Sequence, residues 1–332
     1  IIIIFIILMI PAYYGNSHYD VYYKLDDSLP KDLAFNVANS NLAKKFNITS
    51  PEIIILDKNV SSSEVDELTD ELKNVKGIDL VLAPSEIINN GLETILPDEL
   101  QDLFNNDKYQ LILTNSTYEI ASDKLNNQIT TINKIVHKYD KKAIVAGEGA
   151  LMKDLISIAD HDFKMVNYTS LAVIFVIMVL VLKSLSLPII LSLVIEFAIF
   201  INMAIAYYTG TSLPFIASIV VGTIQLGATI DYAILMSTTY IEKRQKSANK
   251  KKCMEETLQF TIPSIITSAL CFFAATASVG FYTKIDMIGS ICNLLARGSI
   301  ISMVSVIFIL PTLLMMFDKI VLRNKNVKKE GV

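Results

Sequence analysis

Five long apolar runs follow one another between about Met165 and Phe317, and they constrain the fold more than any other feature of the sequence. A run of about 20 mostly apolar residues can cross a bilayer as a helix. We place the runs at about 165–183, 187–208, 213–239, 262–282 and 287–317. The chain is 52% hydrophobic, which is too apolar for an ordinary soluble domain. The sequence therefore predicts an α-helical polytopic membrane protein with five full transmembrane helices at residues 164–317.

Two further segments precede these helices. Residues 1–10 are also apolar, but they lack the basic region with which a signal peptide begins. We interpret residues 1–14 as the end of a partial transmembrane helix, so the chain is expected to be a fragment of a longer protein. Residues 15–163 are more polar and are expected to form a domain outside the membrane.

Charge placement predicts the topology. Residues 15–163 contain 25 acidic residues against 14 lysines, a net charge of −11. By contrast, the connection at 240–261 and the tail at 318–332 are rich in lysine and arginine. Because short basic loops stay on the cytoplasmic side, we expect the connection and the tail in the cytoplasm and the acidic domain outside. The expected location is the cytoplasmic membrane of a bacterium.

The acidic domain shows a strand–helix–strand pattern that occurs twice. Amphipathic helices are expected after the capping residue Ser61 and over about 118–139. Short apolar runs typical of buried strands lie at 52–56, 78–82, 109–113 and 143–146. This order predicts an extracytoplasmic α+β domain of the ferredoxin-like type.

Two segments stand apart from this pattern. An insertion at 84–107 has the spacing of short amphipathic helices, so it either packs back on the sheet or forms a tip that faces a substrate or partner. Residues 147–149, Gly-Glu-Gly, lead into an amphipathic helix at 150–163 that is expected to run toward the membrane.

An acidic side chain interrupts the third apolar run. Residues 227–232 read Gly-Ala-Thr-Ile-Asp-Tyr, which places Asp231 well below the membrane surface. A carboxylate there costs at least ~2.5 kcal/mol on insertion scales, so an intramembrane acid is a functional hypothesis by default. We expect Asp231 to bind and release a proton. Tyr232 points about 100° away, so it reaches a different neighbour, and we expect it to hydrogen-bond a partner carboxylate. Gly227 and Ala228 are small enough to let another helix approach closely.

Other polar residues in the runs are candidates for a proton relay. Glu196 lies at about the depth of Asp231, so it is either a relay group or a protonated packing group. Gln225 adds a polar group one and a half turns before Asp231. We expect Asn202 to form an interhelical hydrogen bond, and Arg297 to anchor the last span at the outer surface rather than to join a relay.

The sequence lacks the patterns of several other functions. It has no glycine-rich phosphate loop, its three cysteines and three histidines have no metal-ligand spacing, and no nucleophile arrangement is recognisable. The acidic balance argues against nucleic acid as a partner. We therefore expect no enzyme, no metal and no cofactor.

Several stretches resemble the MMPL family of the resistance–nodulation–division (RND) superfamily. Residues 227–235 with 240–244 (Tyr-Ile-Glu-Lys-Arg) are similar to its signature. Residues 295–298 (Leu-Ala-Arg-Gly) through 309–314 (Ile-Leu-Pro-Thr-Leu-Leu) are similar to its last span. Residues 147–150 (Gly-Glu-Gly-Ala) are similar to its domain exit. The resemblance covers essentially the whole chain, which looks like the C-terminal half of such a protein, with a porter-type external domain.

The resemblance implies half of an exporter of lipids, drugs or other hydrophobic and amphipathic compounds, driven by the proton gradient. The family pairs the Asp-Tyr of one half with the Asp-Tyr of the other, so Asp231 and Tyr232 match half of a proton site. The expected partners are membrane lipid, the substrate, and a second transporter half or a second copy. Two alternatives stay open, namely a non-transporting membrane scaffold or sensor that binds a partner or lipid, and an accessory proton-driven motor for protein secretion.

Overall fold

The computed structural model describes residues 1–24, 28–84 and 108–322, and of Asp160 only the backbone. Nearly all of the expected insertion at 84–107 and most of the basic tail lie outside the described residues. The described part is mostly helical, with a small sheet region. It divides into two compact units, Pro30–Asp160 (the sheet unit) and Ile1–Leu29 with His161–Val332 (the helical unit).

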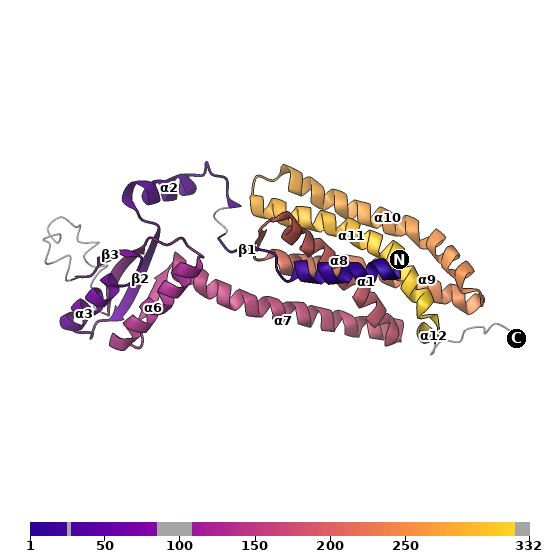
Figure 1. Ribbon diagram of the computed structural model, residues 1–332, viewed down its shortest axis with the longest axis horizontal. Helices are drawn as coiled ribbons and strands as arrows, with labels where there is room; N and C mark the ends of the chain where they lie inside the picture. Colours follow the sequence, from indigo (N-terminus) through magenta and orange to yellow (C-terminus); the bar gives the residue numbers. More distant parts are fainter. Residues whose placement is uncertain (25–27, 85–107, 323–332) are drawn as a thin grey trace. The chain divides into compact units, whose positions relative to one another are not determined.

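Five of the described helices are long and apolar enough to cross a membrane, as predicted (Figure 1). A shorter apolar helix, α1 (Ile2–Asn16), precedes them and continues slightly beyond its expected end at residue 14. The five long helices are α7 (Glu148–Leu182), α8 (Ser186–Thr209), α9 (Ala217–Lys246), α10 (Lys250–Tyr282) and α11 (Asp286–Met316). The chain is therefore built as a multi-pass membrane protein.

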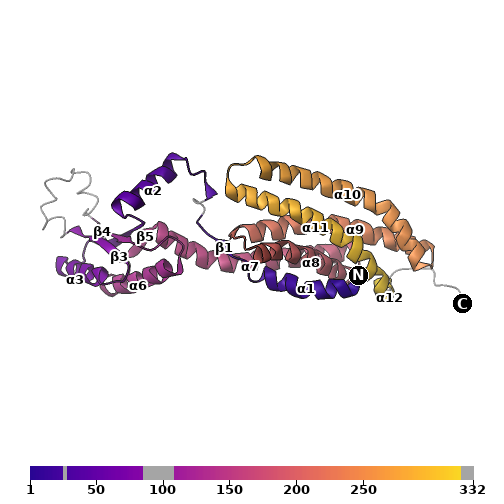
Figure 2. The same ribbon diagram turned by 45° about the horizontal axis from the view of Figure 1, so that its top comes forward.

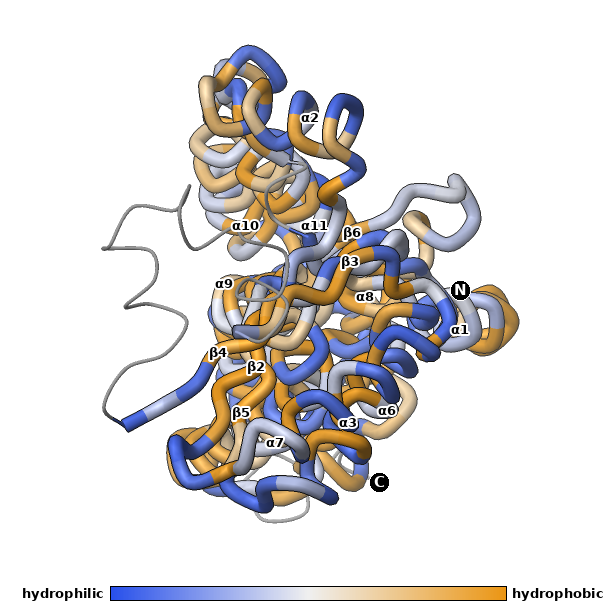
Figure 3. Tube along the Cα trace, turned by 90° about the vertical axis from the view of Figure 1, so that its left-hand side faces the viewer, coloured by the Kyte–Doolittle hydropathy of each residue, from blue (hydrophilic) through white to orange (hydrophobic). Residues whose placement is uncertain are grey.

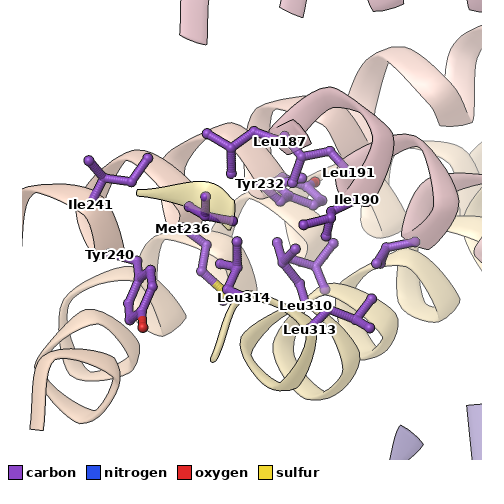
Figure 4. Close-up of a cluster of buried hydrophobic side chains, with 14 of the residues drawn as sticks. Leu187, Ile190, Leu191, Tyr232, Met236, Tyr240, Ile241, Leu310, Leu313 and Leu314 are labelled. Carbon is purple, nitrogen blue, oxygen red and sulfur yellow. The ribbon is translucent and has the colours of Figure 1, made fainter. Parts of the chain in front are cut away.

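The centre of the helical unit lies between α8, α9 and α11. Figure 4 shows part of its main apolar cluster, where Leu191, Tyr232 and Leu310 come from these three helices. Helix α1 lies along α8 (Figure 2), with the rings of Phe5 and Phe197 edge to face at a centroid distance of 4.6 Å. The apolar stretch of α8 is 61% buried, whereas that of α7 and of α10 is 11% buried. The outer helices thus leave an apolar surface that suits contact with lipid.

The basic connection expected at 240–261 is much shorter in the structure. Helix α9 continues to Lys246 and α10 begins at Lys250, so residues 247–249 alone link them. The reason is that lysine, arginine and glutamate are good helix formers. In addition, the Asn249 side chain caps α10 by accepting hydrogen bonds from the backbone N–H groups of Lys251 and Lys252.

Two other boundaries of the helical unit differ from the prediction. The third span begins at Ala217, because residues 213–214 form a short strand, β6 (Leu213–Pro214), that pairs in parallel with β1 (Val21–Tyr22). The amphipathic helix expected at 150–163 and the first span form one continuous helix, α7. No helix-breaking residue separates these two parts of the sequence.

The sheet unit contains one antiparallel sheet of four strands in the order β3-β4-β2-β5. The strands are β2 (Ser50–Asp57), β3 (Ile78–Leu82), β4 (Tyr109–Ser116) and β5 (Ile144–Gly147), close to the predicted apolar runs. Their hydrophobic character is visible in β2 and β4 of Figure 3. Helices α3 (Ser62–Lys73) and α6 (Asp123–Tyr139) cover one face and bury Ile54, Ile112 and Val136. A further helix, α2 (Ala34–Phe46), has no buried side chain.

Serine side chains set the start of both covering helices. Ser61 and Glu64 form a reciprocal capping box at α3, as the sequence predicted. Helix α6 begins at Asp123 rather than near residue 118, because the Ser122 hydroxyl accepts a hydrogen bond from the backbone N–H of Leu125.

A buried carboxylate joins the sheet to the start of α7. Glu52 is 1% exposed; the Ser50 hydroxyl donates to its Oε1 at 3.2 Å, and the backbone N–H of Ala150 donates to its Oε2 at 3.4 Å. A Cβ at Gly147 or Gly149 would collide with this carboxylate, which explains the Gly-Glu-Gly sequence. Burial raises the pKa of Glu52 to about 7, although hydrogen bonds from Ser50 and from the backbone of Gly149 and Ala150 act in the opposite direction.

We expect Glu52→Gln to remove a pH dependence of stability. The folded chain binds the Glu52 proton more tightly than the unfolded chain, so the free energy of unfolding falls as the pH rises from about 4.5 to about 7. The loss is on the order of 3 kcal/mol. Glutamine keeps an acceptor oxygen but does not titrate.

The measurement is the protection of β2 and β5 amides against hydrogen exchange in the whole chain across this pH range. Glu67→Gln changes an exposed carboxylate of α3 and should keep the wild-type slope. A wild-type slope in Glu52→Gln would contradict the assignment.

Candidate functional site

Asp231 lies on a side of α9 that is open in the described chain. Ile224 is 42% exposed, Asp231 is exposed, and a Cβ at Gly227 would meet no described atom within 4 Å. Residues spaced three and four positions apart share one side of a helix. We call this side, defined by Ile224, Gly227 and Asp231, the open face of α9. Ala228 beside it is half-buried.

Tyr232 points away from the open face. Its side chain is 6% exposed and lies in the apolar cluster near Leu187, Ile190 and Leu191 of α8 (Figure 4). Consecutive helix residues point about 100° apart, which separates the two side chains of the Asp-Tyr pair. Asp231 and Tyr232 therefore face different surroundings. Among the described residues Tyr232 makes no hydrogen bond, so its expected bond to a partner carboxylate stays a prediction.

Glu196 is half-buried on α8 and makes no hydrogen bond or ion pair within the described residues. Although the sequence places Glu196 and Asp231 at a similar depth, no hydrogen bond joins them among the described residues.

The described residues contain no candidate metal site. Residues 1–24, 28–84 and 108–322 have no cluster of three or more His, Cys, Asp or Glu side chains that could hold an ion.

Gln225 belongs to a buried polar cluster on the side of α9 that lies opposite the open face. The Asn202 side-chain amide of α8 donates to Gln225 Oε1 at 2.8 Å, which confirms the expected interhelical hydrogen bond of Asn202. Gln225 Nε2 donates to the Ser302 hydroxyl at 3.0 Å and to the Gly298 carbonyl at 3.3 Å. The hydroxyls of Thr229 and Ser302 are 2.8 Å apart. We call this group the Gln225 cluster; it links α8, α9 and α11.

The expectation that Arg297 anchors the last span at the surface is wrong. Its Nε donates to Asn202 Oδ1 at 2.9 Å and its second terminal nitrogen donates to the Asn202 backbone carbonyl at 2.7 Å. Arg297 therefore turns inward and joins the Gln225 cluster. Buried polar groups must find partners in apolar surroundings, and Asn202 offers two acceptors at the right place.

A second buried polar group lies near the other end of α9. Arg244 donates to both carboxylate oxygens of Asp318, at 3.0 and 2.8 Å, and the Tyr240 hydroxyl donates to Asp318 Oδ1 at 2.6 Å. Asp318 is the first residue of the short helix α12 (Asp318–Val321). We call these three residues the Arg244 clamp.

Sequence reasoning missed the Arg244 clamp, because Arg244 and Asp318 lie in segments that read as a basic connection and a basic tail. One signal was available. Asp318 is an acid at the end of a span, next to a mostly basic tail, and a carboxylate so close to basic side chains is expected to form an ion pair.

We expect Asn202→Leu to destabilise the helical unit strongly. The change removes the side-chain acceptor of Arg297 Nε and the donor to Gln225 Oε1, and a buried polar group without a partner costs about 1–3 kcal/mol, more for a charge. Thermal unfolding of the purified protein in detergent measures the effect.

Asn167→Leu is the matched control, because Asn167 is an exposed asparagine of α7 and its replacement should change the melting temperature little. Equal melting temperatures for the two variants would show that the Gln225 cluster contributes no stability.

The comparison with known proteins agrees with the resemblance noted in the sequence. The MMPL family model matches residues 61–331, from the start of α3 to the basic tail. None of the curated proteins compared with the chain matches it. The chain belongs to the MMPL family, whose members are transporters of the RND kind rather than enzymes.

Proposed function

We propose that this MMPL-family chain is half of an exporter driven by the proton motive force. It moves lipids, drugs or other hydrophobic or amphipathic compounds outward across the cytoplasmic membrane. The observation that carries the proposal is the position of Asp231, a carboxylate within a membrane-spanning helix that faces out of its own bundle.

A carboxylate that faces lipid costs at least ~2.5 kcal/mol, so the open face of α9 calls for a protein partner. Gly227, one turn from Asp231, leaves room for a second helix to approach closely. The partner we propose is the other transporter half or a second copy, which brings its own acid to Asp231. Two acids in contact share a proton readily, because one of them is held protonated by the charge of the other.

Proton binding at Asp231 removes a charge from this contact, and proton release restores it. The change alters the packing of the two halves and drives the outward step. Tyr232 packs against α8 in this conformation, so its role here is to hold α9 against its own bundle. Glu196 is left without a polar contact to Asp231 among the described residues, and we assign it no relay step.

The sheet unit is proposed to be the external porter-type domain. Its strand order β3-β4-β2-β5, with α3 and α6 on one face, supports a ferredoxin-like assignment. The acidic charge of this region and the basic residues around 243–252 support an outside location for the sheet unit and a cytoplasmic one for the turn between α9 and α10.

We expect Asp231→Asn in the full-length protein to abolish proton-driven efflux from membrane vesicles, because asparagine can hydrogen-bond but does not exchange a proton. Glu242→Gln changes an exposed acid of the same helix and should leave efflux unchanged. Undiminished efflux by Asp231→Asn would overturn the mechanism and favour a scaffold or sensor. A protein-translocation defect without substrate accumulation would point instead to a secretion motor.

A second variant separates contact with the other half from stability. Gly227→Leu adds a side chain where no described atom lies within 4 Å, so the melting temperature of the chain should not fall. The same side chain would block the close approach of a second helix, and efflux should be lost. Normal efflux by Gly227→Leu would exclude the open face as a packing surface.

A further inference from the structure

The Arg244 clamp contains a buried ion pair between Arg244 and Asp318. The side chains of Arg244 and Asp318 are 10% and 11% exposed, and the guanidinium meets both carboxylate oxygens. Two parallel hydrogen bonds of this kind fix geometry as well as supplying energy. Burial alone would raise the pKa of Asp318, but the hydrogen bonds from Arg244 and Tyr240 outweigh it and hold the pKa below its usual range. The ionised form of Asp318, which binds Arg244, is therefore favoured.

The remaining nitrogen of Arg244 secures the end of α9. It donates to the backbone carbonyls of Ser247 and Ala248 at 2.8 and 2.7 Å. These carbonyls belong to the turn between α9 and α10. One guanidinium thus joins three pieces of chain, namely the last turn of α9, the turn that follows, and α12.

The Gln225 cluster and the Arg244 clamp both lie on the side of α9 that faces its own bundle. Gln225, Thr229, Tyr240 and Arg244 are all buried and all bond to α11 or to α12. Asp231 lies between them along the helix, but on the open face. Rotation of α9 by the equivalent of one residue, about 100°, would break both groups and leave buried charges without partners.

We propose that Arg244 and Asp318 are positioning residues that fix the rotational setting of α9 and thereby hold Asp231 on the open face. The proposal rests on the proposed function in so far as Asp231 is the proton site. It adds that α9, α11 and α12 move as one body, so that proton binding shifts this body against the other half rather than turning α9 within its bundle. Rigid packed elements joined in this way transmit a small shift without deforming.

The test uses a spin label attached at Gly227→Cys, on the open face, in a chain whose three native cysteines are replaced by serine. The label reports directly on the surroundings of the open face and needs no transport. With the clamp intact we expect a mobile spectrum. In Asp318→Asn the mobile component should be lost, because α9 can turn and the label moves toward the bundle.

A conservative variant distinguishes positioning from a general loss of structure. Asp318→Glu keeps a carboxylate that can accept from Arg244 and Tyr240, so it should keep the mobile component. Tyr240→Phe removes one hydrogen bond only and should give a partial loss, which keeps the test usable if Asp318→Asn does not fold. Glu256→Gln breaks the exposed Lys243–Glu256 pair between α9 and α10 and should change nothing.

An unchanged label spectrum in both Asp318→Asn and Tyr240→Phe would overturn the proposal, as would a loss of the mobile component in Asp318→Glu as large as in Asp318→Asn. In the same clamp variants of the full-length protein, with Gly227 and the native cysteines kept, the pH profile of efflux should shift in Asp318→Asn and keep its wild-type form in Asp318→Glu. Failure of the proposed function would appear separately, as normal efflux by Asp231→Asn with the label spectra as expected.

Discussion

The structure of the helical unit depends on one constraint, which is that polar groups inside a membrane protein must find partners within the protein. Helix α9 has several polar side chains, and they lie on two different sides of the helix. Gln225 and Arg244 face the bundle and are bonded to neighbouring helices, whereas Asp231 faces away. A costly carboxylate within the apolar run of α9 is thus left open by the bundle. This contrast supports the proposal that a second protein surface completes the site.

The sheet unit also contains a buried polar group that needs partners, namely the carboxylate of Glu52. Glu52 is a carboxylate in an apolar core, and it is tolerated because the first turn of α7 supplies backbone N–H groups that would otherwise lack partners. The close approach requires glycine at 147 and at 149. A short motif that resembled a family feature therefore has a local physical reason, which is independent of any transport role.

Family membership establishes that the chain belongs to a class of transporters. The packing of α9 suggests which helices of this chain move together. The proposed mechanism couples a small chemical event, proton binding, to a movement of one transporter half against the other. The proposed unit of α9, α11 and α12, joined by the Gln225 cluster and the Arg244 clamp, is a stiff element that could carry such a movement. The apolar surfaces of α7 and α10 suit contact with lipid around it.

Local patterns in the sequence determined much of this protein. The length of the apolar runs predicted the five spans, strand-like runs predicted the sheet, Ser61 predicted a capped helix, and the acid in the third span marked Asp231. Such features depend on residues close together in the chain, so periodicity and composition reveal them. Helix ends were less predictable, because charged residues with high helix propensity extended α9 and α10 beyond their apolar parts.

Only the tertiary structure decided which polar residues meet. Arg244 and Asp318 are 74 positions apart, Arg297 and Asn202 are 95 apart, and Glu52 and Ala150 are 98 apart. Each contact depends on how helices rotate and pack, and a sequence pattern gives the depth of a side chain without the direction in which its neighbours lie. For this reason the sequence identified Asp231 as a costly acid, whereas the packing of α9 placed it on the open face.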